Sequence, residues 1–390
     1  MSKPRKLPKG SEKTIVFNFF NFLNFLNFLE LSTCETKKNN FMEAQKVIIS
    51  DNIKEQLGNE IEKTDHDRLF VLCDTTTQEC CLPLISDINP VKKAKVIVIK
   101  PTDTHKNLDT IAHVWQEMQN GGATRHSLLV NLGGGMVTDL GGFAASTFKR
   151  GVKFINIPTT LLSMVDASVG GKTGINFGGL KNEIGVFNNA DAVILDTEFL
   201  KTMDNDNLCS GYAEMIKHGL INNEQMWTEL LTFDILNPDL NQLRRMVAES
   251  VAVKQRIVLD DPFEHGIRKA LNVGHTIGHA FESFAMRRNP ILHGHAVAYG
   301  IVCELYLSAV KAGFPTEKMH ATVRYIREHY GRMGITCDNY EELLELMTHD
   351  KKNTAGVINF TLLGGIGDIR INQTASKEDI CEALDFYREG

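Results

Sequence analysis

The stretch SLLVNLGGGMVTDLGGF, residues 127–143, decides the fold of this chain. Residues 127–132 are mostly apolar and have the length of a buried strand. Three glycines follow at 133–135, and residues 136–148 suit a helix. Glycine lets the backbone approach a ligand closely, and the first N–H groups of a helix favour a phosphate. The stretch therefore predicts a strand–turn–helix unit, whose turn either binds a nucleotide or is a tight structural turn.

Strands of the same kind occur on both sides of this unit. The apolar, β-branched runs predict them at 68–74, 95–100, 153–158 and 192–196. A helix is expected over 107–120, where apolar residues recur on one helical face. Strands that alternate with helices are typical of a parallel sheet, so we predict an α/β, Rossmann-like domain over 42–198.

The remaining residues, 199–390, have a mainly helical pattern. Apolar residues recur at helical spacing over 242–261, 272–286, 295–313, 317–333, 340–349 and 376–388. One interruption, 357–371, predicts a short hairpin with a glycine turn. A cleft between an α/β domain and a helical domain is a common place for a cofactor and a substrate to meet.

Composition narrows the class of protein. The chain has 390 residues and a formal net charge of −6, which gives no support for nucleic-acid binding. Its 8 cysteines form no metal or disulfide spacing, so we expect reduced thiols in a cytoplasmic protein. Residues 1–41 contain a basic start and an apolar run interrupted by regular asparagines, which is too short for a membrane span. We expect them to lie outside the enzyme, with translation starting at Met42.

The segment between the strands at 153–158 and 192–196 is long, polar and rich in glycine. We expect residues 158–185 to form a functional loop without a helix of its own. Its Lys172 and Lys181 suit a phosphate or a carboxylate, although surface lysines in a solvated loop are the alternative.

Four histidines lie within a short part of the helical half. His275 and His279 are four residues apart on one helix face, and His293 and His295 follow. Glu214 lies upstream, at a predicted helix start. Spacing alone favours His275 with His279 as metal ligands. Glu264, Arg268 and Asn272 also fall four apart, and they form either a polar wall or a surface ion pair if that segment is helical.

Taken together, these segments resemble the 3-dehydroquinate synthase family from about Asp74 to Gly367. The shared phrases are GGGMVTDLGGF, RGVKFINIPTTLLSMVDASVGGKTGIN, GLKNEIG, GYAEMIKHG, LNVGHTIGHAFE, LHG and DKK. Two positions depart from the family pattern. His295 stands where a glutamate usually follows LHG, and Asp103 with Lys106 replaces a GExxK segment.

The resemblance implies a site for NAD, a divalent metal (zinc or cobalt) and a sugar phosphate. It assigns the metal to Glu214, His275 and His293, which moves His279 to the substrate. It places NAD near Asp103, Lys106, Gly134, Gly135, Asp139, Thr159, Thr160, Asp166, Lys172 and Lys181. It places the substrate near Lys172, Asn182, Lys254, Arg268, Asn272, His279 and one of Lys351 or Lys352. It implies a homodimer in which Arg150 reaches the substrate phosphate in the neighbouring subunit. It also places Lys217 near the cofactor or substrate.

The reaction implied is the conversion of 3-deoxy-D-arabino-heptulosonate 7-phosphate to 3-dehydroquinate and phosphate, in the shikimate pathway of aromatic amino-acid biosynthesis. It proceeds by transient oxidation with NAD, phosphate elimination, reduction and ring closure. The alternatives are another sugar-phosphate cyclase and an iron- or zinc-dependent polyol dehydrogenase, which would release NADH. An inactive NAD-binding scaffold is disfavoured, because every implied metal ligand is present.

Overall fold

The computed structural model describes residues 44–348 and 358–390. The expectations for residues 1–41 and for Lys351 and Lys352 therefore lie outside the described residues. Residues Ala44–Gly390 form one compact unit. No helix in the described ranges is both long enough and apolar enough to cross a membrane.

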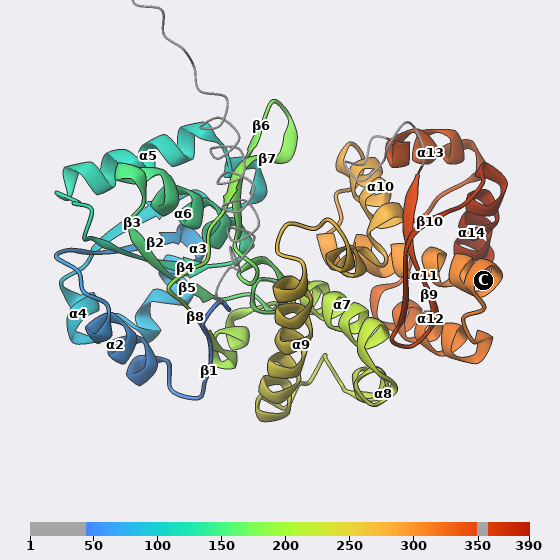
Figure 1. Ribbon diagram of the computed structural model, residues 1–390, viewed down its shortest axis with the longest axis horizontal. Helices are drawn as coiled ribbons and strands as arrows, with labels where there is room; N and C mark the ends of the chain where they lie inside the picture. The colour runs from blue at the N-terminus through green and yellow to red at the C-terminus, as the bar shows by residue number, and fades with distance from the viewer. Residues whose placement is uncertain (1–43, 349–357) are drawn as a thin grey trace, which may run out of the picture. The chain divides into compact units, whose positions relative to one another are not determined.

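A parallel sheet forms the first part of this unit (Figure 1). Its strand order is β1-β8-β5-β4-β2-β3, and every neighbouring pair is parallel. The strands are β1 (Val47–Ser50), β2 (Leu69–Asp74), β3 (Lys95–Ile99), β4 (Leu128–Gly133), β5 (Lys153–Pro158) and β8 (Ala192–Asp196). The last five confirm the predicted strands. The sequence analysis did not predict β1, a four-residue edge strand that pairs only with β8.

Helices follow most of these strands, as a parallel sheet requires. They are α2 (Ile53–Lys63), α3 (Thr75–Cys80), α4 (Asn89–Lys92), α5 (Leu108–Asn120) and α6 (Gly135–Thr147). The predicted helix at 107–120 is α5, where the Asn107 side chain accepts a hydrogen bond from the Thr110 N–H at 3.0 Å and so caps the first turn. The glycine-rich turn joins β4 to α6, which packs on β4 and β5.

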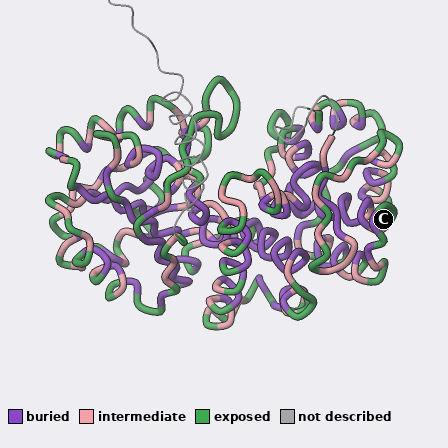
Figure 2. The backbone as a smooth tube through the Cα atoms, viewed as in Figure 1, coloured by how far each residue is buried: buried purple, intermediate pink, exposed green. Residues whose placement is uncertain are grey.

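The second part is mainly helical. Its helices are α7 (Asn205–Asn222), α8 (Glu224–Thr232), α9 (Leu240–Asp260), α10 (His275–Met286), α11 (His293–Ala312), α12 (Thr316–Tyr330), α13 (Tyr340–Thr348) and α14 (Lys377–Glu389). The predicted hairpin is the antiparallel pair β9 (Asn359–Gly365) and β10 (Asp368–Thr374). Helices α7 and α11 are buried along most of their length (Figure 2). They therefore form the centre of this part.

The expectation that residues 158–185 form a loop without a helix of its own was wrong. The segment forms a π-helical turn, Ser163–Ala167, and then an antiparallel hairpin of β6 (Lys172–Phe177) and β7 (Leu180–Phe187). Gly178 and Gly179 make the two-residue turn with φ of 60° and 82°, a backbone conformation that favours glycine. All eight residues of β7 are exposed, so the segment lacks the alternation of buried and exposed residues that marks a strand in sequence.

Two local predictions in the helical half were also wrong. Glu214 lies in the middle of α7, because the Asp204 side chain caps that helix ten residues earlier by accepting from the Asn207 N–H at 2.7 Å. Glu264, Arg268 and Asn272 do not share a helix face, since Glu264 has a φ of 63° and only Ile267–Asn272 form a 3-10 turn.

Candidate active site

Three side chains that could hold a metal ion converge from three helices: Glu214 of α7, His275 of α10 and His293 of α11. Each histidine is the first residue of its helix. Glycines allow these helices to approach closely. A Cβ at Gly294 would lie 1.8 Å from the Ser210 carbonyl oxygen of α7, and a Cβ at Gly300 would lie 1.9 Å from the Gly274 carbonyl oxygen before α10. The glycine contacts therefore set the positions of the three side chains.

The geometry of this cluster fits a metal ion. The Glu214 Oε1 atom lies 3.4 Å from His275 Nε2 and 3.7 Å from His293 Nε2. Two atoms that bind zinc at about 2.1 Å with a tetrahedral angle are about 3.4 Å apart. Glu214 Oε1 is also buried without a hydrogen-bond partner among the described residues. A buried carboxylate oxygen left in this state is a ready ligand, because a buried polar atom without a hydrogen bond is costly.

The other atoms of the three side chains are held in place. Glu214 Oε2 accepts a hydrogen bond from buried Lys217. His275 Nδ1 donates to the Val273 carbonyl oxygen at 3.1 Å, and His293 Nδ1 lies 3.1 Å from Glu282 Oε2. Because each imidazole is bound through Nδ1, both Nε2 atoms face Glu214.

Burial and neighbouring charges shift the pKa values of His293 and Glu214 in opposite directions. Burial opposes a charged imidazole, but the carboxylates of Glu214 and Glu282 overcome this effect and raise the pKa of His293 to about 10. Burial also opposes ionisation of Glu214, yet Lys217 and the two histidines keep its pKa well below the usual range. Glu214 is therefore an anion ready to bind a cation.

His279 lies beside the cluster and outside its ligand set. Its ring centroid is 5.3 Å from that of His275 and 6.0 Å from that of His293. The convergent ligand atoms include those of His293 and exclude those of His279. Spacing on the helix face alone did not find this arrangement, whereas the family resemblance implied it.

The predicted cations are paired with carboxylates across the unit. Lys254 of α9 binds the carboxylate of Asp166 and donates to the Asp166 carbonyl oxygen at 2.6 Å. Lys172 of β6 lies 2.5 Å from Glu264 Oε2, and Glu264 Oε1 accepts from Asn272 Nδ2 at 2.9 Å. These contacts join the segment after β5 to α9 and to the residues between α9 and α10.

Arg268 differs from its predicted surface role. It is 2% exposed and does not pair with Glu264; its guanidinium donates to the carbonyl oxygens of Pro262 and Gly170 at 2.5 and 3.2 Å. Its Nε atom is buried without a hydrogen-bond partner among the described residues. Of the two alternatives for this segment, the surface ion pair between Glu264 and Arg268 is therefore wrong. A buried guanidinium with unused hydrogen-bonding capacity suits an anion.

The implied cofactor residues gather at the carboxyl ends of neighbouring strands. Gly134 and Gly135 follow β4, and Thr159 and Thr160 follow the adjacent strand β5. The order of the sheet reverses between β2 and β4, and ligands of open α/β sheets bind beside such a point. The turn is tightly packed, since a Cβ at Gly135 would lie 3.0 Å from the Ala167 Cβ.

Lysines connect this edge of the sheet with the β6–β7 hairpin. Lys106 is buried and lies 2.5 Å from both Asp139 Oδ2 and Asn182 Oδ1. Asp139 falls just beyond the first turn of α6, so it pairs with Lys106 and does not cap the helix. Lys181 lies 2.8 Å from Glu282 Oε1 and 3.7 Å from Asp103 Oδ2.

The remaining predicted positions are more peripheral. Arg150 is exposed, and it lies with Lys149 in consecutive left-handed conformations, φ of 73° and 50°. His295 packs its ring 5.2 Å from that of Tyr330, away from the ligand atoms. Sequence reasoning missed Glu282, which contacts His293 and Lys181. The signal was present, because Glu282 shares the α10 face of His275 and His279 at i+7.

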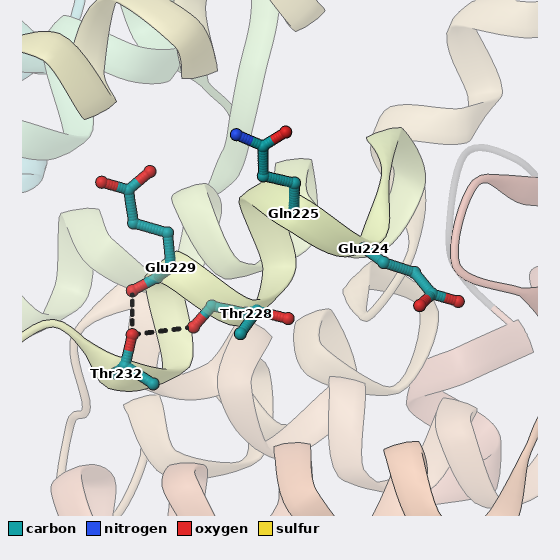
Figure 3. A pocket seen from close by; sticks show the side chains of 5 residues that line it. All are labelled: Glu224, Gln225, Thr228, Glu229 and Thr232. Atoms are coloured by element: carbon teal, nitrogen blue, oxygen red, sulfur yellow. Dashed lines mark hydrogen bonds between the residues drawn. The ribbon is translucent and has the colours of Figure 1, made fainter.

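A shallow surface depression follows α8 and carries no such chemistry (Figure 3). It is lined by Glu224, Gln225, Thr228, Glu229 and Thr232. Its two carboxylates are neutralised, Glu224 by Lys318 and Glu229 by Arg245. None of these residues belongs to the convergent ligand set.

Comparison with known proteins assigns the chain to a family. Residues 96–210 match the family model described as 3-dehydroquinate synthase N-terminal, and residues 211–353 match the 3-dehydroquinate synthase C-terminal model. A 3-dehydroquinate synthase of Parabacteroides distasonis is 55% identical over 349 residues, 89% of this chain and 99% of that protein. A 3-dehydroquinate synthase of Pyrococcus furiosus is 37% identical over 310 residues, 80% of this chain and 90% of that protein.

Solved structures show the same fold. A 2-deoxy-scyllo-inosose synthase complexed with carbaglucose-6-phosphate, NAD+ and Co2+ has a TM-score of 0.76 at 23% identity, over 88% of this chain and 96% of that one. An iron-containing alcohol dehydrogenase of Thermotoga maritima has a TM-score of 0.63 at 14% identity, over 89% of this chain and 99% of that one. The family models and the sequence relatives carry the narrower assignment: this chain belongs to the 3-dehydroquinate synthase family.

Proposed function

We propose that this chain catalyses the reaction of its family, the conversion of 3-deoxy-D-arabino-heptulosonate 7-phosphate into 3-dehydroquinate and phosphate. This is a phosphate-eliminating carbon–oxygen lyase reaction of the shikimate pathway. The observation that carries the proposal is the convergence of Glu214, His275 and His293. The ion pairs of Lys254 with Asp166 and of Lys172 with Glu264 lie in the same compact unit. A relative of that function at 55% identity supports it.

Glu214, His275 and His293 would hold the divalent metal, and zinc and cobalt both suit one carboxylate and two imidazoles. A metal held there would supply Lewis-acid polarisation of the C5 hydroxyl, and bound NAD would supply the hydride acceptor and donor for the same carbon. The protein contributes orientation. Lys217 holds the second oxygen of Glu214, which leaves Oε1 directed at the metal position.

NAD would lie across the carboxyl edge of the sheet. The first N–H groups of α6, after Gly134 and Gly135, suit its phosphates, as at other helix N-termini. The residues that would surround the rest of the cofactor are Asp103, Lys106, Asp139, Thr159, Thr160, Asp166, Lys172 and Lys181. We assign cofactor binding to residues 42–198 and metal and substrate binding mainly to residues 199–390.

Lysine and arginine side chains would hold the two anionic ends of the substrate. Lys254 and Arg268 suit its carboxylate, because both are buried and electrostatic attraction is stronger in the protein interior than in water. Burial lowers the pKa of Lys254 and Asp166 offsets part of this effect, so a bound anion would favour the charged lysine. Lys172, Asn182, Asn272 and His279 would hold the phosphate and neighbouring hydroxyls, together with Lys351 or Lys352.

His279 is suited to holding or moving a proton at the substrate. Its imidazole lies beside both histidines of the metal cluster and outside the ligand set. The substrate phosphate can accept a proton as it leaves, and no further strong base is required.

We also propose a cytoplasmic homodimer in which Arg150 reaches the phosphate site of the neighbouring subunit. Arg150 is exposed on a strained turn, and strained backbone is often retained for function. Phe177, Leu180 and Phe187 expose apolar side chains on the β6–β7 hairpin, as an interface would use. The cysteines among the described residues are free thiols, which suits a reducing compartment.

A stoichiometric assay tests the proposed reaction. The purified protein is given the heptulosonate phosphate, a trace of NAD and Zn2+ or Co2+, and phosphate, dehydroquinate and NADH are measured together. We expect equal amounts of phosphate and dehydroquinate without accumulation of NADH. NADH formed in proportion to product would indicate a polyol dehydrogenase, and phosphate without dehydroquinate would indicate another cyclase. His275→Ala should lose the metal and the activity and keep its circular dichroism spectrum.

A further inference from the structure

We propose that Glu282 is a positioning residue of the metal centre, which fixes the imidazole of His293 and couples it to Lys181 on the β6–β7 hairpin. This inference rests on the proposed metal site. It concerns a side chain that binds neither metal nor substrate in the assignment above. The carboxylate of Glu282 contacts both partners at once, His293 Nδ1 at 3.1 Å through Oε2 and Lys181 Nζ at 2.8 Å through Oε1.

Glu282 fixes the orientation of the His293 imidazole. An imidazole can bind a metal through Nε2 only if its ring is turned correctly and its Nδ1 carries the proton. His275 meets both conditions by donating from Nδ1 to the Val273 carbonyl oxygen. His293 has no backbone carbonyl at hydrogen-bonding distance from Nδ1 among the described contacts, and Glu282 Oε2 takes that place. A carboxylate behind a metal-bound imidazole also makes the imidazole a stronger ligand.

Helical spacing explains why Glu282 can do this. His275, His279 and Glu282 lie at i, i+4 and i+7 on α10, so their side chains share one face. That face is directed toward the start of α11, where His293 is the first helical residue. The Glu282 side chain is only 13% exposed, so its ion pairs are less screened than those at the surface.

Glu282 also links the β6–β7 hairpin to His293. Ion pairs of Lys172 with Glu264 and of Lys181 with Glu282 join the β6–β7 hairpin to the helical half. The same hairpin carries Asn182, which binds Lys106 at the edge of the sheet. A shift of Lys181 therefore acts on the carboxylate that orients His293. Through Glu282, the hairpin above the cofactor edge and the metal centre share one hydrogen-bonded chain.

Metal affinity provides a test that does not depend on turnover. Zn2+ affinity is measured by competition with a chelator, and the visible spectrum of the Co2+ form reports ligand geometry. Glu282→Ala should weaken Zn2+ binding by about 10–100-fold and change the Co2+ spectrum. Glu282→Gln retains an acceptor oxygen for His293 and should recover much of the affinity. This conservative variant also guards against failure of the alanine variant to fold.

Two further variants separate these two roles of Glu282. Lys181→Met should keep Zn2+ affinity within about fivefold, since Glu282 Oε2 still accepts from His293 Nδ1 and the Lys181 end of the ion pair is 45% exposed. It should speed hydrogen exchange of residues 172–187, because the hairpin loses an ion pair to α10. Glu282→Ala should speed the same exchange. Glu342→Ala removes an exposed ion pair with Arg288, just after α10, and should change neither measurement.

The outcomes distinguish this inference from the proposed function. Wild-type Zn2+ affinity and an unchanged Co2+ spectrum in Glu282→Ala would overturn the positioning role, provided that Glu214→Ala and His275→Ala lose the metal. Unchanged hairpin exchange in both Glu282→Ala and Lys181→Met would overturn the coupling. If Glu214→Ala and His275→Ala themselves bind Zn2+ normally, the proposed metal site is wrong and the inference fails with it.

Discussion

Removal of the Glu304 side chain should destabilise the protein and disturb the metal centre together. Glu304 is a buried residue of α11 whose carboxylate caps the start of α10. Its Oε2 accepts from the Gly274 N–H at 2.7 Å, and its Oε1 accepts from the Ile277 N–H at 3.1 Å. A negative charge at a helix N-terminus is also favoured by the helix dipole.

The magnitude follows from these two contacts. Each hydrogen bond to a charged group contributes about 1.5–3 kcal/mol, so loss of both should cost about 3–6 kcal/mol in the free energy of unfolding. Glu304→Gln keeps one acceptor oxygen and should cost about 2 kcal/mol. Because His275 is the first residue of α10, loss of the cap should also weaken Zn2+ binding.

Urea unfolding of metal-free protein, followed by circular dichroism, measures the first effect, and chelator competition measures the second. Glu328→Gln, on the exposed face of α12, is the matched control and should leave both unchanged. A loss below about 1 kcal/mol in Glu304→Ala, equal to that of a surface substitution, would refute the capping argument.

Three further predictions concern stability. Burial and the neighbouring Lys217 lower the pKa of His218 to about 3, so between pH 3 and its ordinary value near 6.5 the unfolded state binds one more proton. When the pH falls from 7 to 5, the free energy of unfolding of wild type should therefore decrease by about 2 kcal/mol more than that of His218→Asn. Equal decreases in urea titrations of the two proteins would contradict this. Gly300→Ala should separate α10 from α11 and lower both the urea midpoint and Zn2+ affinity, whereas Gly334→Ala, with open space around it, should change neither. Removal of metal by a chelator should lower the unfolding temperature of wild type, since ligand at 100 times its Kd adds about 2.7 kcal/mol, and should leave Glu214→Ala unaffected.

The sheet and the long helices could be predicted because their patterns arise from burial. Strands β2 to β5 and β8 are apolar runs bounded by turn residues, and α5 shows one buried face. Strand β1 escaped prediction because four residues at an edge, with only Ser50 buried, leave little pattern. The β6–β7 hairpin escaped because all eight residues of β7 are exposed, which leaves no alternation of buried and exposed positions in the sequence.

The candidate site could be predicted only in part, for a related reason. Local spacing pointed to His275 with His279, since those residues are neighbours on one helix. The convergent ligand set instead needs Glu214 and His293 from two other helices, brought together by close packing at Gly294 and Gly300. Local sequence cannot reveal such contacts, and the family resemblance supplied them. Neither approach found Glu282, because its role depends on the side of α10 that faces His293.

The most direct test of the account is to locate the metal. Crystals grown with Zn2+ or Co2+, and diffraction data collected at the absorption edge of that metal, would give its position and ligands. The account predicts one ion bound by Glu214 Oε1, His275 Nε2 and His293 Nε2 at about 2.1 Å from each. An ion held by His275 and His279, with His293 unbound, would contradict it.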